Sequence, residues 1–265
     1  MMPTSVDRAT RSFWQNHWTG RAAPRGFDPS DRTLANYVNS RFHQYFRHTL
    51  GHRGGALIEL GCAQSTWLPY FARQFGFRVT GLDYSEVGCA RAREMLDDVG
   101  VVGDVVCADM FNPPDKFEAA FDAVVSFGLI EHFEDTAAAV TAAARFVAPG
   151  GRMLTFVPNM VGLPGAIQRY VDRAIFDIHV PLDVDALRSA HEASGLTVVD
   201  CHYFILANWH VVNASRLARG WASYPYRAAV AGSSRLAWAL EKHLIKNGAN
   251  RLTSPYVVCV ADKNP

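Results

Sequence analysis

The chain has 265 residues, of which 49% are hydrophobic and 19% are charged, and its formal net charge is +1 at pH 7. These values are typical of a globular chain long enough for one large α/β domain. The sequence contains no run of 18 apolar residues and no basic run interleaved with aromatic residues, so neither a membrane-spanning helix nor a nucleic-acid partner is expected.

The first 54 residues are expected to form a helical cap on the domain. Residues 1–58 carry eight Arg against three acidic residues, whereas residues 59–203 carry ten Lys and Arg against twenty acidic residues. Residues 204–265 are basic again, with eight Lys and Arg against two acidic residues. Basic flanks around an acidic centre fit two alternatives: flanks that meet an anionic acceptor or membrane surface, or flanks that dock on the acidic core.

The first strand is expected at residues 55–60, and an acidic residue, Glu59, lies at its end. Gly61, Cys62 and Ala63 follow, and small residues there let a ligand approach the backbone closely. The carboxylate can accept hydrogen bonds from a ligand's amine or hydroxyl groups. The loop contains neither G-x-G-x-x-G nor a P-loop, so it predicts a nucleotide-type site whose ligand need not be a polyphosphate.

The second strand is expected at 77–82 and is followed by Asp83, Tyr84 and Ser85. Ser85 can also cap the next helix, so its role can be purely structural. A third strand, at 103–107, leads into a short segment of mixed polarity that consists of Ala108, Asp109 and Met110.

The fourth strand, at 121–125, leads into the segment 126–133, whose sequence is S-F-G-L-I-E-H-F. The turn V-A-P-G-G at 147–151 precedes a fifth strand at 151–156. Two more strands are expected at 196–203 and 254–261. Helices are expected between the first six strands, at Ser65–Gln74, Ser85–Leu96, Thr136–Phe146 and Asp183–Ser194.

These segments resemble, in order and spacing, five motifs of the class I S-adenosylmethionine-dependent methyltransferases across roughly residues 55–158. In motif I, [D/E]-x-G-x-G-x-G, Glu59 and Gly61 match, while Ala63 and Ser65 replace the later glycines. The resemblance implies an α/β fold with a doubly wound seven-stranded sheet whose last strand is antiparallel. It also implies that S-adenosylmethionine is the methyl donor and S-adenosylhomocysteine the product.

The resemblance also implies roles for individual residues. Asp83 would hold both ribose hydroxyls, Asp109 and its apolar neighbours would hold the adenine, and the segment 126–133 would line the methyl-donor end of the pocket. The expected cofactor-binding residues are Glu59, Gly61, Cys62, Ala63, Asp83, Tyr84, Ser85, Ala108, Asp109, Met110, Phe127, Gly128, Leu129 and His132.

Three segments are expected to build the acceptor pocket of this single domain, residues 1–265. They are the N-terminal cap, the variable segment 158–182 and an insertion at 204–253, whose pattern predicts a helical lid between the sixth and seventh strands. The expected acceptor-binding residues are Trp14, Trp18, Met160, Tyr170, His179, Trp209 and His210. Other aromatic residues of these segments, Phe27 and Trp221 among them, fit either an apolar acceptor site or packing of the helices on the core.

Two histidines are candidates for a catalytic base. His132 follows Glu131 near the expected position of the methyl group, and His179 lies in the variable segment; each can instead be structural. Some relatives carry E-x-x-E-H at the first position and bind a divalent ion, but this chain has G-L-I-E-H, with Gly128 in place of the first acid. Glu131 and His132 alone supply too few ligands, so no metal is expected unless distant residues complete a site.

The expected function is methyl transfer to a small-molecule acceptor, on an oxygen atom and in natural-product metabolism, with a possibly anionic acceptor. A lipid-linked or glycan acceptor, a fold member that uses the cofactor for other chemistry, and an NAD-dependent dehydrogenase are the alternatives. The N-terminal residues lack the apolar core of a signal peptide, so a cytoplasmic protein is expected. The five scattered cysteines form no C-x-x-C pair and are expected to be reduced thiols.

Overall fold

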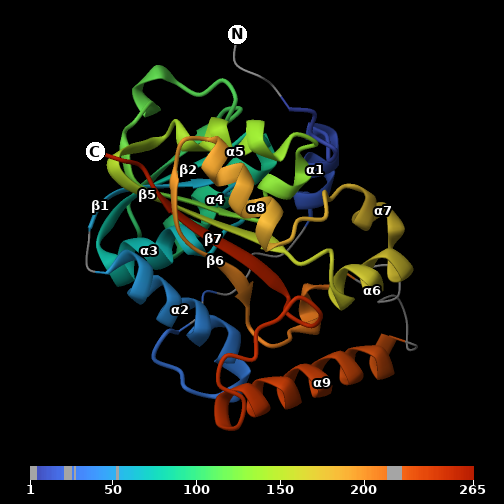
Figure 1. The fold of residues 1–265 in the computed structure, drawn as a ribbon. Coiled ribbons are helices and arrows are strands. Elements are labelled where there is room, and N and C mark those ends of the chain that lie inside the picture. The colour runs from blue at the N-terminus through green and yellow to red at the C-terminus, as the bar shows by residue number, and fades with distance from the viewer. Residues whose placement is uncertain (1–4, 21–25, 27, 52–53, 214–222) are drawn as a thin grey trace.

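A computed structural model describes residues 5–20, 26, 28–51, 54–213 and 223–265 of the chain. Within them, seven strands form one sheet in the order β3-β2-β1-β4-β5-β7-β6 (Figure 1). The strands are β1 (Gly55–Leu60), β2 (Phe77–Asp83), β3 (Gly103–Cys107), β4 (Phe121–Phe127), β5 (Val147–Pro158), β6 (Thr197–Phe204) and β7 (Tyr256–Asp262). Pairings among β1 to β5 are parallel, and β7 is antiparallel to both β5 and β6, so the predicted fold class is confirmed.

Helices cover both faces of the sheet, because its central strands are apolar on both sides. One face packs against α2 (Tyr37–Leu50), α3 (Trp67–Phe75) and α4 (Glu86–Asp98). The other packs against α5 (Thr136–Ala144) and α8 (Val184–Ala193). Side-chain caps fix the N-terminal ends of two helices. Ser85 Oγ accepts from Gly88 N at 3.1 Å, as the sequence predicts, and Asp183 Oδ1 accepts from Ala186 N at 3.0 Å.

The register of the parallel strands brings their carboxyl ends to one edge of the sheet. Leu60 pairs with both Leu82 and Ser126, and Asp83 pairs with Cys107. The strand-end acids and the loops after β1, β2, β3 and β4 are therefore neighbours. In open parallel sheets this edge is the usual place for a ligand.

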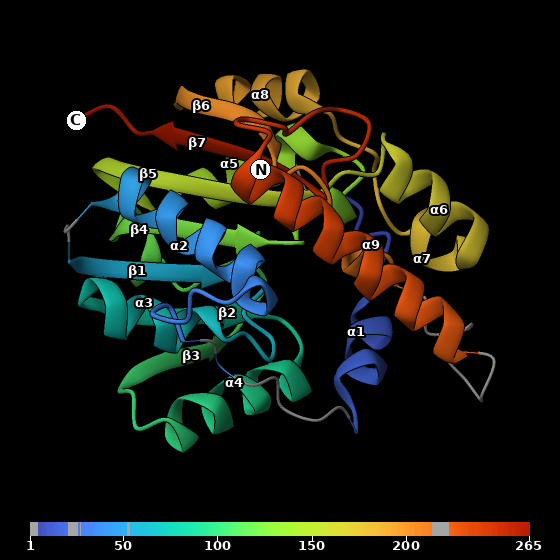
Figure 2. The same cartoon turned by 90° about the horizontal axis from the view of Figure 1, so that it is seen from below.

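Three further helices lie at this end of the molecule. The N-terminal α1 (Arg11–Trp18) contacts α4, and α6 (Leu163–Val171) and α7 (Arg173–Asp177) follow β5. The sequence predicted residues 158–182 only as a variable segment, without these two helices. In Figure 2, α1 stands beside the carboxyl ends of the strands, with α6 and α7 further along the same end.

The insertion between β6 and β7 is helical, as predicted. It contains the 3₁₀ turn Trp209–Val211 and the long helix α9 (Ser223–His243). Figure 2 shows α9 crossing this end of the molecule at an angle to the strands. Among the described residues, no helix combines the length and the apolar character that crossing a membrane requires.

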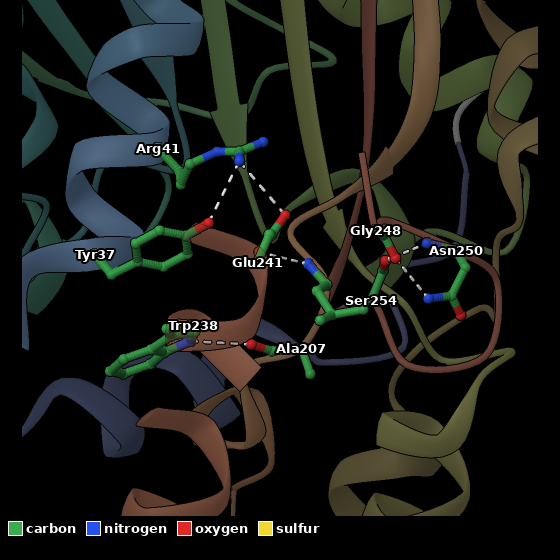
Figure 3. A network of polar contacts seen from close by, with 9 residues as sticks. Tyr37, Arg41, Ala207, Trp238, Glu241, Gly248, Asn250 and Ser254 are labelled. Carbon is green, nitrogen blue, oxygen red and sulfur yellow. Dashed lines mark hydrogen bonds and ion pairs between the residues drawn. The ribbon is translucent and has the colours of Figure 1, made fainter. Parts of the chain in front are cut away.

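A polar network fastens the end of α9 to α2 (Figure 3). The Glu241 side chain, 1% exposed, accepts from Leu206 N at 2.9 Å and forms an ion pair of 3.5 Å with Arg41. Trp238 Nε1 donates to the carbonyl of Ala207 at 3.0 Å. The insertion is thus held at its base by a buried charge and a buried indole.

Candidate cofactor and acceptor cavities

A first cavity of about 400 Å³ opens at the carboxyl ends of β1, β2 and β4. Its walls come from the four loops at this edge and from α1. The predicted residues that line it are Glu59, Gly61, Ala63, Asp83, Tyr84, Ala108, Asp109, Met110, Phe127, Gly128, Leu129, His132, Trp14 and Trp18. Twelve of the fourteen predicted cofactor residues are in that set.

Glu59 lies at the bottom of the first cavity and is only 2% exposed. Its Oε2 accepts a hydrogen bond of 2.9 Å from Ser65 Oγ, which ties the loop after β1 to the strand end. Burial raises the pKa of Glu59 to about 8, because a buried carboxylate loses hydration. Glu59 is therefore a hydrogen-bonding group that a donor-rich or cationic ligand would ionise.

The loop after β1 depends on a glycine at position 61. Gly61 has φ of +74°, a conformation that residues with a Cβ rarely adopt. A Cβ there would also approach the Leu129 side chain to 3.2 Å. The glycine matched to motif I therefore serves both a backbone turn and the close approach of the loop after β4.

Asp83 connects two neighbouring loops through its carboxylate. Its oxygens accept hydrogen bonds from Ala63 N at 3.1 Å and from Ser85 N at 2.7 Å. Burial raises the pKa of Asp83 to about 6, although these backbone donors favour the ionised form. The same carboxylate lines the cavity, where its remaining acceptor capacity is available to a ligand.

The helix α1 covers the first cavity. Gln15 of this helix accepts a hydrogen bond of 3.1 Å from Val87 N at the start of α4. Asp7, just before α1, accepts a hydrogen bond from the Tyr84 hydroxyl. The Trp14 ring meets His132 edge to face, with centroids 5.0 Å apart. The predicted N-terminal cap thus contributes directly to this site.

A second cavity of about 340 Å³ adjoins the first. Both are lined by Trp14, Phe127, Gly128 and His132. Most of its other walls are apolar or aromatic: Phe13, Phe42, Phe156, Val157, Pro158, Met160, Ile175, Ile178, Val211 and Tyr256. Its polar groups are few, namely His17, Glu131, His132, Gln168, His179 and Asn213. Such a chamber suits a flat, apolar molecule with a small polar end.

The boundary between the two cavities is an aromatic stack. The ring of Phe127 lies parallel to Trp67 at 4.9 Å and parallel to Phe156 at 4.8 Å. Phe127 ends β4, Trp67 begins α3 and Phe156 belongs to β5, so three elements fix the wall. A wall held from three sides keeps a constant shape between the two chambers.

The two candidate bases face each other at this boundary. The rings of His132 and His179 have centroids 4.6 Å apart. Each Nδ1 lies near a backbone carbonyl: His132 near Ile178 O at 2.9 Å and His179 near Ile175 O at 2.6 Å. Burial lowers the pKa of both rings to about 4, so both are neutral at pH 7.

The structure also brings Glu131 to the same place. One ligand-capable atom from each of Glu131, His132 and His179 lies within 4.8 Å of the others. The sequence predicts no metal unless distant residues complete a site, and the variable segment places His179 beside Glu131 and His132. A backbone hydrogen bond joins the two segments, since Val180 N donates to Glu131 O at 2.6 Å.

Several predicted residues lie outside both cavities. The side chain of Cys62 is fully buried, and Ser85 is buried as the cap of α4. Tyr170 is 93% exposed on α6, and His210 packs against Trp238 at 6.1 Å, next to Trp209. None of these five lines either cavity. They are not supported as ligand-binding residues, whereas Met160 and His179 do line the second cavity.

The insertion contributes less to the second cavity than predicted. Among its described residues, only Val211 and Asn213 line it. Phe27 and Trp221, predicted among the acceptor-site aromatics, lie outside the described residues. Residues that the sequence did not single out include Trp67, Phe42, Phe156 and Tyr256. Only the fold reveals them, because each belongs to an element whose inner end reaches the site.

Comparisons with known proteins agree with this geometry. A family described as "Methyltransferase domain" matches residues 25–200. A ubiquinone biosynthesis O-methyltransferase of Alkalilimnicola ehrlichii is 31% identical over 137 residues, which are 50% of this chain and 54% of that protein. A probable S-adenosylmethionine-dependent methyltransferase of Mycolicibacterium smegmatis is 32% identical over 49% of this chain and 51% of its own length. The chain thus spans about half the length of these relatives.

Solved structures share the fold at low sequence identity. The [4+2]-cyclase SpnF has a TM-score of 0.62 and 20% identity, over 99% of this chain and 98% of its own. Geranyl diphosphate C-methyltransferase from Streptomyces coelicolor, solved with Mg²⁺, geranyl diphosphate and S-adenosylhomocysteine, has a TM-score of 0.62 and 15% identity, over 96% and 98%. At such identities the likeness concerns the fold alone.

Proposed function

The chain belongs to the class I S-adenosylmethionine-dependent methyltransferases, and we propose that it methylates a hydroxyl oxygen of a small aromatic molecule. S-adenosylmethionine is the cofactor of this family. The first cavity fits it, because buried carboxylates, small loop residues and apolar walls surround a space suited to an adenosyl group. When bound there, the cofactor supplies an activated sulfonium methyl group.

The observation that carries the proposal is the adjoining second cavity with a neutral histidine pair at the shared boundary. Aromatic walls favour a flat ring, and the carboxylate of Glu131 lies beside His132 and His179. A hydroxyl placed there meets imidazoles that are neutral at pH 7 and can accept a hydrogen bond. General-base assistance contributes about 10²–10⁴-fold when the pKa of the base lies near the working pH, so the main contribution of these two rings is to orient the hydroxyl by hydrogen bonding.

The chain's other contributions are positioning and exclusion of water. The stacked rings of Trp67, Phe127 and Phe156 fix the wall along which the acceptor lies. Trp14 closes the junction from the side of α1. Holding two reactants in line in a closed site lowers the barrier without any further chemical group.

A lipid-linked acceptor is a second candidate. Relatives in the comparison bear the name ubiquinone biosynthesis O-methyltransferase, and that name supports an oxygen acceptor on a ring. The helix α9 carries Leu236, 63% exposed, and Leu244 just after it is 76% exposed, next to basic residues such as Lys242 and Lys246. These features favour contact of the insertion with a lipid tail or an anionic surface.

The test is methyl transfer from labelled S-adenosylmethionine to a panel of acceptors. The panel pairs each phenol with its deoxy analogue, with an alkyl alcohol and with a long-chain phenol. We expect label on phenols, with none on the deoxy partners. Preference for the long-chain phenol over its short partner would select the lipid-linked alternative. Cofactor binding without label on any phenol would contradict the proposal and favour non-methylation chemistry.

A further inference from the structure

We propose that Glu131, His132 and His179 form a divalent-metal site at the boundary of the two cavities, with one ligand position open to the acceptor. The ion belongs to the class bound by two imidazoles and one carboxylate, of which Zn²⁺ is the representative. Its function rests on the proposed methylation of a hydroxyl, but its existence does not. It places a cation where the acceptor oxygen must lose its proton.

The burial of the Glu131 carboxylate supports a cation at this place. Its side chain is only 1% exposed, and neither oxygen has a hydrogen-bond partner among the residues that the structure describes. His132 Nε2 lies 3.9 Å from its Oε1. Buried polar groups without partners are rare and costly, because they lose hydration without compensation. A bound cation would satisfy both oxygens.

The orientation of that carboxylate also supports the site. A Cβ built on Gly128 would lie 3.4 Å from Glu131 Oε1, so this oxygen faces the space above Gly128. Gly128 lines both cavities. Glu131 is thus aimed toward the junction rather than into the core. The residue that leaves this space free is the glycine that replaces an acid in the E-x-x-E-H pattern.

The hydrogen bonds of the two histidines support the site as well. Each Nδ1 can only donate to its carbonyl partner, Ile178 O at 2.9 Å or Ile175 O at 2.6 Å. In the neutral rings Nε2 therefore carries the lone pair, and the backbone of Gly128 also lies within reach of the His132 ring. Metal-binding histidines are held in this way, with one ring nitrogen donating to a carbonyl while the other binds the ion.

A bound ion requires the three ligand atoms to move only slightly closer together. The three ligand atoms lie within 4.8 Å of one another, and bonds of about 2.0–2.2 Å around a tetrahedral ion place them roughly 3–4 Å apart. Side-chain rotation of Glu131 about its outer bonds supplies this shift. Two neutral nitrogens favour Zn²⁺ or a similar ion over Mg²⁺, which prefers oxygen ligands.

The proposed methyl transfer uses S-adenosylmethionine, the methyl donor of the family. The acceptor hydroxyl takes the open ligand position, its O–H bond breaks and the proton leaves to solvent. The resulting oxygen anion forms the O–CH₃ bond as the S–CH₃ bond of the cofactor breaks, and neutral S-adenosylhomocysteine remains. One carboxylate, one oxygen anion and a divalent ion sum to zero charge. With the ion bound, the cation rather than the imidazoles promotes ionisation of the hydroxyl.

The experiment uses the full chain after treatment with a chelator and titrates it with Co²⁺, whose visible absorption reports its coordination, and then with Zn²⁺ in competition. We expect one saturable site, with absorption typical of four or five ligands. Glu131→Gln and His179→Gln should each weaken Co²⁺ binding by more than about tenfold. The control His48→Gln, on the exposed face of α2, should bind Co²⁺ as the unaltered chain does.

Binding of S-adenosylhomocysteine shows that each variant is folded, because neither Glu131 nor His179 lines the first cavity. A chain that binds S-adenosylhomocysteine but shows no saturable Co²⁺ site would overturn the proposal. So would a Co²⁺ affinity in Glu131→Gln and in His179→Gln that equals the affinity of the unaltered chain. Transfer of label by the metal-free chain at the full rate would retain the proposed function and reject a role for the metal in it. A chain that binds Co²⁺ but methylates no hydroxyl would retain the metal site and reject the proposed function.

Discussion

The rings of His132 and His179 lie 4.6 Å apart, although α5, β5, α6 and α7 separate them in the chain. Backbone contacts hold the two segments together: Val180 N donates to Glu131 O, and Arg8 N donates to His132 O. The loop after β4, the segment before α8 and the N-terminal segment therefore meet at one point. That meeting point separates the two cavities, and the expected behaviour of the protein follows from it.

Asp83→Ala should weaken S-adenosylhomocysteine binding by at least about tenfold, because a partly buried acceptor of ligand hydroxyls is lost. The loops after β1 and β2 also lose their shared acceptor, since Ala63 N and Ser85 N both donate to this carboxylate. Calorimetry measures the affinity. Asp104→Ala, on the exposed side of β3, is the control. Unchanged affinity in Asp83→Ala would show that the ribose lies elsewhere.

Cofactor binding should tighten and release protons as the pH rises from about 6 to 8. Burial raises the pKa of Glu59 to about 8 and that of Asp83 to about 6, so Glu59 is largely protonated in the free protein at neutral pH. Hydroxyl and ammonium donors of the cofactor favour the ionised carboxylates. Calorimetry in two buffers of different ionisation enthalpy counts the protons. Binding that is independent of pH and of buffer would be the contrary outcome.

Glu59 and Asp83 also make the free energy of unfolding of the cofactor-free protein depend on pH. Their folded pKa values lie above the ordinary values of 4.5 and 3.8, so the folded state binds more protons than the unfolded state. The stabilisation is complete below the ordinary values and is lost as the pH rises through about 6 and then 8. The free energy of unfolding, measured with urea, should therefore decrease over this window through these two groups. In Glu59→Gln the upper part of the decrease should vanish.

Trp14→Ala should raise the KM for the acceptor and weaken cofactor binding several-fold, because this ring lines both cavities and contacts His132. An aromatic pair contributes about 0.5–1.5 kcal/mol beyond its buried area, and Trp14 is half-buried. Steady-state kinetics and calorimetry separate the two effects. Tyr170→Ala is the matched control, since this ring is 93% exposed and should leave both constants unchanged. A change of KM in Tyr170→Ala but not in Trp14→Ala would show that Tyr170, and not Trp14, contacts the acceptor.

Glu241→Ala should lower the free energy of unfolding by about 2–3 kcal/mol, because Arg41 loses its buried partner and Leu206 N loses its acceptor. Arg41 remains 30% exposed, which keeps the loss below that for a fully buried pair. Glu241→Gln retains an acceptor for Leu206 N and should lose less. Urea denaturation compares the two variants. Equal stability of Glu241→Ala and the unaltered chain would mean that this network does not fasten α9.

The strands could be predicted from the sequence because each is a short apolar run between turn residues. The expected strand at 151–156 extends back to Val147 in the structure, because the P-G-G turn itself pairs: Phe121 lies opposite Val147, and Gly150 N donates to Lys263 O. Strand-end acids were identified for the same reason, since the residue after an apolar run in a parallel sheet lies at the ligand edge.

The acceptor side could not be predicted in the same way. Tyr170 and Trp209 are aromatic residues in the expected segments, but the direction of a side chain depends on which face of its helix or turn packs. On α6 that packed face contains Pro164 and Gln168, and Tyr170 points to solvent. The pairing of His179 with Glu131 and His132 depends on contacts across about 47 residues of chain. No local pattern encodes such a distance.

The chain leaves the sheet at Phe204 and returns at Tyr256, and these two residues are direct partners in the β6–β7 ladder. Thr253 Oγ1 donates to the carbonyl of Leu206 at 2.7 Å, one step further out. The insertion is therefore the loop of a β-hairpin, and the strand pair and this hydrogen bond close the hairpin at its base. A change of length within the insertion should therefore leave the alignment of the strands unchanged, provided that the contacts of Trp238 and Glu241 are kept. The sheet that carries the first cavity is thus structurally separate from the helical connection above it.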